Sequence, residues 1–310
     1  MNLRRWIVGT GKVGHYRDEA DFMAASEGEP VLMLSQGRIN LAWNSWAPVS
    51  LWTAVTGQAR VFAQDLRADL DVEGVLVAEH GSRVSCQSAE IRSTSLMGLL
   101  LPPAYLRTLM RRELGDADAD APIYPAVIRN DLNLHAMLRR LAELGRSETT
   151  DPASLEGLVE KIALRLIAQQ RDLEAYVPRC PGRSLRYRRQ VLLRLLRARN
   201  YIEHSIGGES NLAHLSGLAR MSPAHFVRIY HEVFGQTPHR HLMQSRLLVA
   251  RDMLVRSECA IGELYLTLGF DNRCAFTRVF KQHFGVPPTR LRAEARARRI
   301  AMPQGASAGA

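Results

Sequence analysis

The chain has 310 residues, of which 46% are hydrophobic and 23% charged, and its formal net charge is +10. This composition excludes collagen-like and wholly disordered chains, and the length is enough for two domains, each with its own core. The best apolar run, Leu96–Leu101, ends at Pro102 and is too short to span a membrane. The N-terminus lacks the apolar stretch of a secretory signal. The four cysteines form no CxxC pair, which indicates free thiols in a reducing cytoplasm.

The positive charge is concentrated in the C-terminal part of the chain. Residues 1–180 carry 20 Lys and Arg against 23 Asp and Glu, whereas residues 181–310 carry 21 against 8. A basic domain of this size is typical of a nucleic-acid partner and, less often, of an anionic membrane surface. We therefore expect the C-terminal part to bind nucleic acid.

Residues 1–175 are predicted to form a β-rich domain with trailing helices. Short apolar or alternating segments punctuated by glycines indicate a sandwich or small barrel. The predicted strand segments are Pro30–Leu34, Arg38–Trp43, Ser50–Val55, Ala59–Ala63, Gly74–Glu79, Arg83–Cys86 and Thr94–Leu101.

Three helices are predicted to follow the strands. Two cover Tyr105–Leu114 and Asn130–Leu144, and a third opens at Asp151-Pro152, which supply its cap and first residue. The third helix carries an apolar stripe wide enough for a coiled-coil-like seam. Either this stripe joins two copies of the chain or it packs on the chain's own β domain. The stripe residues are Leu155, Leu158, Ile162 and Leu166.

Residues 176–189 contain two prolines, a glycine and a basic run, and are predicted to be an interdomain linker. The helical domain then covers 190–292. Residues 293–310 end in an Ala, Gly and Ser-rich segment, which predicts a flexible tail.

An internal repeat lies in the basic half. Residues 221–238 and 271–288 align at a shift of 50 residues, and each copy follows a short apolar helix, over Asn211–Ala219 and Ala260–Leu268. A short helix, a tight turn and a second helix form a helix-turn-helix unit, and Ser222 is the predicted cap of the second helix in the first unit. The matched pairs are Phe226/Phe276, Arg228/Arg278, Tyr230/Phe280, Phe234/Phe284, Gly235/Gly285 and Pro238/Pro288.

A long helix is predicted between the two units, from Thr237-Pro238 to about Ser257. Its roughly 20 residues span about 30 Å at about 1.5 Å each. Successive major-groove faces of B-DNA lie about 34 Å apart. Such a spacer can therefore place two recognition helices in adjacent grooves of one duplex.

The segment from about Tyr187 to Arg292 resembles the DNA-binding domain of AraC/XylS-type transcription regulators. The resemblance rests on the first unit, the linking helix, Ile261–Phe270, the run Phe276–Lys281 and the ending Gly285–Arg292. It implies a sequence-specific transcription regulator, an activator rather than a repressor, with double-stranded DNA and RNA polymerase as partners. It also implies a cupin-like N-terminal domain that binds a small effector and forms a homodimer.

In this family the N-terminal halves of the recognition helices face base edges. Arginine can bond guanine with two hydrogen bonds, and small apolar side chains can meet the methyl group of thymine. Arg220 departs from the family, because glycine is usual there, and a left-handed arginine costs about 1 kcal/mol. Tyr265, His241 and Leu291 are further departures. The residues that the resemblance assigns to DNA reading are Ala224, Val227, Arg228, Arg273, Cys274, Thr277 and Arg278.

Three tryptophans fall in one stretch of the N-terminal part. They either line an effector pocket, as aromatic residues often do, or pack in the core between strands. The three are Trp43, Trp46 and Trp52.

The sequence offers little support for a metal site or a reactive cysteine. Only His15, His80 and His135 precede the predicted linker, and their scatter predicts no metal site, no cofactor and no metal enzyme. Cys274 lies beside Arg273, which would favour a reactive thiolate, or it is simply a small residue at the DNA surface.

Two other functional classes stay open. One is an enzyme or DNA-repair protein with an appended DNA-binding module, which requires a nucleophile or metal site before residue 180; Cys86 is the available thiol in the predicted strands. The other is an architectural DNA binder without an effector.

Overall fold

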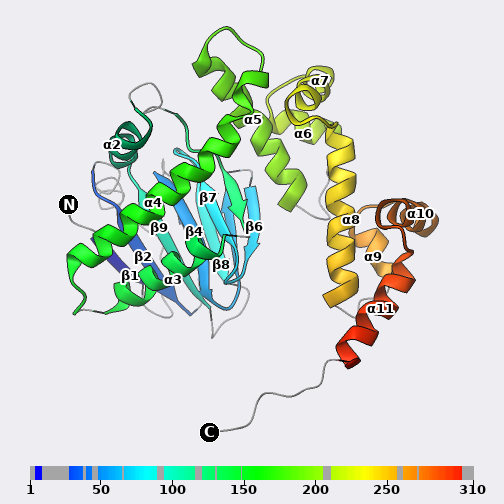
Figure 1. The fold of residues 1–310 in the computed structure, drawn as a ribbon, viewed down its shortest axis with the longest axis horizontal. Coiled ribbons are helices and arrows are strands. Elements are labelled where there is room, and N and C mark those ends of the chain that lie inside the picture. The colour runs from blue at the N-terminus through cyan, green and yellow to red at the C-terminus, as the bar shows by residue number, and fades with distance from the viewer. Residues whose placement is uncertain are drawn as a thin grey trace.

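The computed structural model describes residues 4–8, 28–37, 40–43, 48–64, 66–88, 94–115, 121–129, 131–147, 149–204, 211–256, 261–270 and 272–301. These residues form a β-rich part followed by helices, and the chain ends in an all-helical part (Figure 1). Within these ranges, no helix is long and apolar enough to cross a membrane.

The strands form two sheets. One has six strands in the order β1-β2-β9-β4-β7-β10, and the other has four in the order β3-β8-β5-β6. The pair β1–β2 is parallel, and the other pairs are antiparallel. The strands are β1 Arg4–Val8, β2 Val31–Gln36, β3 Asn40–Trp43, β4 Val49–Thr56, β5 Ala59–Ala63, β6 Leu66–Leu70, β7 Val75–Ala78, β8 Val84–Ser88, β9 Ser95–Leu101 and β10 Ala126–Ile128.

The central strands of the six-stranded sheet, β2, β9, β4 and β7, are buried on both faces. Successive side chains of a strand point to opposite faces, so Val31 and Met33 of β2 meet the four-stranded sheet, while Leu32 and Leu34 meet helices. Figure 1 shows α3 (Leu132–Arg146) and α4 (Pro152–Glu174) lying across that face. The result is three layers, which confirms the predicted β-rich sandwich with trailing helices. The helices are α2 Pro103–Leu114, α3 Leu132–Arg146 and α4 Pro152–Glu174.

All seven predicted strand segments overlap strands of the structure, and three strands were missed. β6 alternates buried and exposed residues, with Leu66, Ala68 and Leu70 inside and Arg67 and Asp69 outside. That alternation was legible in the sequence. β1 lies in the basic start of the chain, and β10 has only three residues, all half-buried.

The apolar stripe on α4 belongs to the core of the β-rich part. Leu155, Ile162 and Leu166 are buried against the sheet and α3, and Leu158 is half-buried against the same cluster. The ion pair between Arg165 and Asp131, with 2.7 Å between Nε and Oδ2, also ties α4 to α3. The stripe therefore packs on the chain's own β-rich part, which was one of the two predicted alternatives. Its burial there does not support the other alternative, a dimer seam.

Trp52 is also a core residue. Its ring is buried between the two sheets, and its Nε1 donates a hydrogen bond of 2.9 Å to Ser50 Oγ. The ring packs directly on Gly98 of the neighbouring strand, where a Cβ atom would lie 2.5 Å from a ring carbon. Trp52 therefore does not line an effector pocket; of Trp43 only the backbone is described, and Trp46 lies outside the described residues.

The helical part is attached to the β-rich part through its first long helix, α5. This helix packs against β6 and β10, and Asn200 donates a hydrogen bond of 2.6 Å to the carbonyl of Pro125. Arg197 forms an ion pair of 2.7 Å with Glu79, whose side chain is only 9% exposed. The helices are α5 Leu185–His204, α6 Leu212–Leu218, α7 Pro223–Phe234, α8 Pro238–Arg256, α9 Ile261–Thr267, α10 Arg273–Phe284 and α11 Pro288–Ala301.

The predicted linker, residues 176–189, is a packed connection. It contains a short 3-10 helix, η2 (Val177–Arg179), and the first residues of α5. Val177 and Cys180 are buried in one cluster with residues of α5 to α8, and Tyr124 from the β-rich part lies in the same cluster. The two parts of the chain therefore share a core.

We expect Gly98→Ala to lower the free energy of unfolding by about 1–3 kcal/mol, because the added methyl group forces the Trp52 ring out of its place. Urea denaturation followed by tryptophan fluorescence measures this change. Gly157→Ala is the control, since nothing lies within 4 Å of that Cβ position on α4. An equal effect of both changes would contradict the close packing of Trp52.

Candidate nucleic-acid interface

The helical part contains two helix-turn-helix units of the same dimensions. The first helices, α6 and α9, each have 7 residues, and the second helices, α7 and α10, each have 12. Both second helices end at a left-handed glycine, Gly235 and Gly285, whose N–H bonds the carbonyl four residues earlier at 2.8 Å. Their starts differ. Asn272 caps α10 through its side chain, whereas Ser222 occupies the cap position of α7 without such a bond.

The turns of the two units are built alike. Arg220 N–H bonds Gly217 and Met221 N–H bonds Ser216, and the same two bonds recur 49 residues later, at Gly269 and Phe270. Arg220 has a φ of 52° and Gly269 a φ of 71°, so the arginine does adopt the left-handed conformation expected at this position. The second helices repeat at 50 residues, so the second unit has one extra residue between turn and recognition helix.

Helix α8 belongs to the cores of both units. Its Leu242 lies in the cluster of the first unit, whereas Leu247, Ala250 and Leu254 lie in the cluster of the second. At 1.5 Å per residue, its 19 residues span roughly 28 Å. Figure 1 shows α8 running continuously from one unit to the other.

A partly buried polar network holds the first unit against α5 and α8. Tyr230 OH lies 2.6 Å from Nδ1 of His241, whose Nε2 is 3.2 Å from Glu203, and Glu203 pairs with Arg199 at 2.9 Å. Burial by itself would raise the pKa of Glu203, but the hydrogen bonds from His241 and Arg199 outweigh it and lower the pKa to about 2. Burial raises the pKa of the Tyr230 hydroxyl. His241, one of the departures from the family pattern, thus has a partner on each side.

The residues assigned to DNA reading lie on the outer faces of α7 and α10. The opposite faces are buried, with Phe226, Ile229 and Tyr230 in the first unit and Phe276 and Phe280 in the second. In both recognition helices, therefore, the assigned residues lie on the face opposite the buried core. Five are exposed and Val227 and Thr277 are half-buried; the exposed ones are Ala224, Arg228, Arg273, Cys274 and Arg278.

Two residues near Arg228 were missed by the sequence prediction. The guanidinium of Arg228 lies 3.2 Å from Glu232 and 3.3 Å from Nδ1 of His225. The spacing of four residues between Arg228 and Glu232 on one helix was the signal that could have found this pair.

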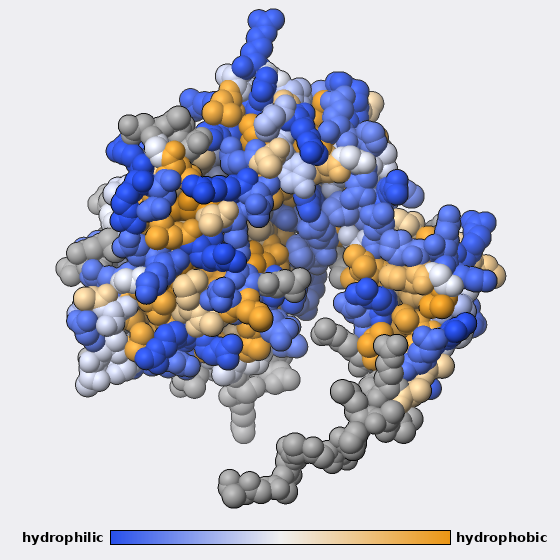
Figure 2. Space-filling view, viewed as in Figure 1, coloured by the Kyte–Doolittle hydropathy of each residue, from blue (hydrophilic) through white to orange (hydrophobic). Residues whose placement is uncertain are grey.

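The second unit stands away from the β-rich part. Figure 2 shows an open gap between the two in this view, with both hydrophilic and hydrophobic side chains along its margins. The contacts of α9, α10 and α11 that the structure describes are made mainly with α8 and with one another. The recognition helix of the second unit is therefore open to a large partner.

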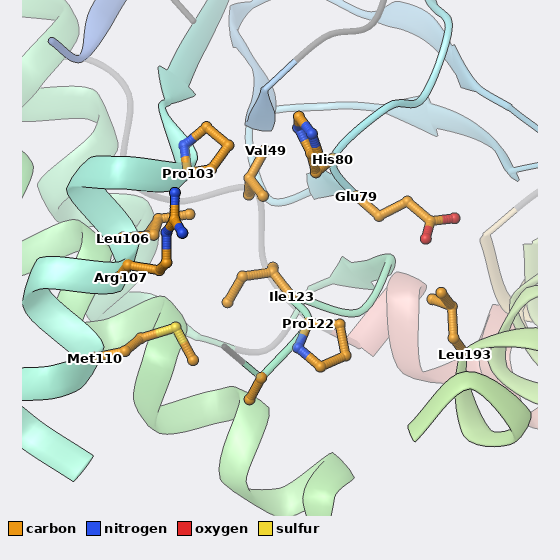
Figure 3. Close-up of a pocket in the computed structure, with 11 residues that line it drawn as sticks. Val49, Glu79, His80, Pro103, Leu106, Arg107, Met110, Pro122, Ile123 and Leu193 are labelled. Carbon is orange, nitrogen blue, oxygen red and sulfur yellow. The ribbon is translucent and has the colours of Figure 1, made fainter. Parts of the chain in front are cut away.

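A separate cavity of about 390 Å³ lies between the β-rich part and α5. Figure 3 shows Leu193 of α5 on one side and Leu106, Arg107 and Met110 of α2 on the other, with Glu79 and His80 at the β-rich end. Most of the lining is apolar. The sequence prediction did not find this cavity, because its walls come from segments far apart in the chain.

Two of the cysteines that the structure describes are buried, and the third is exposed. Burial raises the pKa of the Cys86 thiol, and burial also raises that of Cys180 to about 11. Cys274 is exposed on the recognition helix α10. The described residues contain no group of three or more His, Cys, Asp or Glu that could hold a metal ion.

Comparison with known proteins fits this geometry. Residues 215–294 match the model of a helix-turn-helix domain family. The C-terminal part is an AraC-type helix-turn-helix domain. The probable transcriptional regulator LumQ of Photobacterium leiognathi is 26% identical over 91 residues, which are 29% of this chain and 37% of that protein. The chain thus spans little more than a third of that relative.

Two other relatives of the AraC-type domain differ in how much they cover. The thermoregulatory protein LcrF of Yersinia pestis is 25% identical over 78% of this chain and 88% of its own length. The bifunctional transcriptional activator/DNA repair enzyme AdaA of Bacillus subtilis is 28% identical over 30% of this chain and 44% of its own length.

We expect Arg220→Gly to raise the free energy of unfolding by about 1 kcal/mol, because glycine adopts the left-handed conformation without steric cost. Gly269→Ala, at the matching place of the second turn, should destabilise, since its Cβ would also lie 2.8 Å from Arg246. Urea midpoints measure both changes. Destabilisation by Arg220→Gly would show that the side chain of Arg220 contributes more than its backbone costs.

The low pKa of Glu203 makes stability depend on pH. A carboxyl with a lowered folded-state pKa contributes stability that is present above its ordinary pKa of 4.5 and is lost as pH falls towards about 2. We expect Glu203→Gln to be less stable than wild type at pH 7 and to lose less stability between pH 5 and 2. Thermal melts across this range measure the slope. Glu143→Gln, in an exposed pair with Arg140, should keep the wild-type slope.

Proposed function

We propose that this protein is a sequence-specific transcription regulator that binds double-stranded DNA. The observation that carries the proposal is the pair of helix-turn-helix units with outward-facing recognition helices, joined by the continuous helix α8. A spacing of roughly 28 Å along α8 is compatible with two major-groove segments about 34 Å apart. We also propose that Ala224, Val227 and Arg228, and Arg273, Cys274, Thr277 and Arg278, contact base edges.

The alternative of a DNA-repair enzyme with an appended module is less well supported. Such a protein requires a reactive thiolate or a metal in its N-terminal part. Cys86 is fully buried between the sheets and its pKa is raised, both of which oppose nucleophilic chemistry. We therefore propose a regulator rather than an enzyme.

The resemblance to AraC/XylS-type regulators extends the proposal. It supports activation rather than repression, RNA polymerase as a partner, a homodimer and action in the cytoplasm. It also supports an N-terminal domain over 1–175 with a sensing or dimerisation role, and a DNA-binding domain over 190–292.

Arg228→Ala and Arg273→Ala should each weaken binding to the preferred site by about 1–3 kcal/mol and relax the preference at one base position. The measurement is selection of bound duplexes from a randomised pool, followed by titration of the selected site. Arg296→Ala, on α11, should weaken binding to all sequences about equally. If both variants select the wild-type sequence at every position, these arginines are not the base readers.

A small-molecule effector is the second function that a specific observation favours. We propose that the cavity between α2 and α5 binds a small, mainly apolar molecule, since its lining is mostly apolar and it adjoins the ion pair between Arg197 and Glu79. A ligand there would act directly on α5, which leads into the first DNA-binding unit.

A compound that binds in this cavity should stabilise the wild-type protein by about 2.7 kcal/mol when its free concentration is 100 times its dissociation constant. The melting temperature should rise accordingly. Leu193→Trp narrows the cavity and should abolish the shift, whereas Leu132→Trp, at a site 82% exposed on α3, should keep it. Thermal-shift screening of a compound library measures this. A compound that stabilises wild type and Leu193→Trp equally binds elsewhere.

A further inference from the structure

The two recognition helices carry different charge at matching positions. They align residue by residue at a shift of 50, and their buried aromatic positions match. At three outer positions the second helix is more positive. The pairs are Pro223/Arg273, His231/Lys281 and Glu232/Gln282. With histidine neutral, the charged residues of α7 are Arg228 and Glu232, which cancel, whereas those of α10 are Arg273, Arg278 and Lys281.

The matching arginines also have different neighbours. Arg228 lies 3.2 Å from the carboxylate of Glu232 and 3.3 Å from the ring of His225. The residues at the same places around Arg278 are Gln282 and Ala275, neither of which carries a charge. The acidic residue of the second unit within the described chain, Glu263, lies on the first helix α9 and not on the recognition helix.

This difference changes how each arginine meets DNA. Arg228 has five N–H donors, so it can bond a guanine with two of them while another still bonds Glu232. To reach a phosphate elsewhere Arg228 must leave Glu232, and Glu232 itself repels the phosphates of any duplex that comes near. Contact by α7 is therefore favourable where a guanine lies within reach of the paired Arg228, and it is weak elsewhere. Arg278 has no such competitor on its own helix in the described structure, and three positive residues of α10 attract phosphate regardless of sequence.

We propose that the two units divide the work of binding unequally: α10, besides its base contacts, anchors the protein to DNA through charge, whereas α7 mainly discriminates between sequences, with Glu232 as the residue that makes it selective. This inference rests on the proposed function and names a specificity-determining residue in it. Glu232 acts by holding Arg228 away from sites that offer no good partner.

The test is a reciprocal exchange in the full-length protein, Glu232→Gln and Gln282→Glu. Two DNA probes are used: a duplex pool with a random centre, and the sequence that the wild type selects from that pool. Glu232→Gln should bind the random pool about two- to fivefold more tightly, the range for one exposed ion pair, with little change on the selected sequence. The ratio of its affinity for the selected sequence to its affinity for the random pool therefore falls.

Gln282→Glu should weaken binding to both probes by a similar factor. It should also make the slope of log affinity against log salt shallower by about 0.9, the value for one phosphate contact. Glu294→Gln is the matched control. Glu294 pairs with Arg290 at the same spacing of four residues, at 2.9 Å, and is 44% exposed, as is Glu232. It lies on α11, so its loss should change the affinities for both probes by the same factor.

The outcomes separate the two levels of the proposal. Failure of the wild type to bind either probe at any salt concentration overturns the proposed function. If the wild type binds and Glu232→Gln shifts both affinities by one factor, as Glu294→Gln does, the division between the units is wrong. Circular dichroism melts of all variants identify any that do not fold, and Glu232→Ala then replaces Glu232→Gln as a second removal of the same carboxylate.

Discussion

The arrangement of the helical part depends on one constraint, the continuity of α8. Because Leu242 packs in the core of the first unit and Leu247, Ala250 and Leu254 pack in that of the second, neither unit can turn without breaking its own cluster. The distance between recognition helices is thus set by a hydrogen-bonded backbone and not by a loop. With DNA as the proposed partner, such a rigid pair fits a second spacing only where the duplex bends.

A second constraint acts between the halves of the chain. Helix α5 packs on β6 and β10 on one side and on α6 and α8 on the other. Two arginines of this helix lie two residues apart and face different halves of the chain. Arg197 pairs with Glu79 of the β-rich part, and Arg199 pairs with Glu203 in the polar network of the first unit. A change in the sheet near Glu79 therefore has a short physical route to the first unit. In the described part of the chain, the second unit is joined to the first mainly through α8.

The sequence predicted those features that depend on local patterns. Alternation and turn residues located seven strands, and the repeat located both helix-turn-helix units with Arg220 in the left-handed position. Contacts between distant segments left no such pattern. Glu79 and Arg197 are separated by 118 positions, and the walls of the cavity come from β4, α2 and α5. From the residues alone the α4 stripe fitted two packing partners nearly equally, and the family resemblance favoured the dimer seam. The folded sheet, against which the stripe is buried, instead favours packing within the chain.

The packing of Tyr124 and η2 against the first unit affects how the chain folds during synthesis. The cluster of that unit includes Tyr124, Val177 and Cys180, which leave the ribosome before α5 does. The first unit can thus assemble on a surface that already exists, whereas the cluster of the second draws on residues from Met243 onward and folds last. A message cut short just after α8 would yield a protein with one complete DNA-binding unit. Such a product would keep the fold of the first unit but would lack the positive residues of α10, which are Arg273, Arg278 and Lys281.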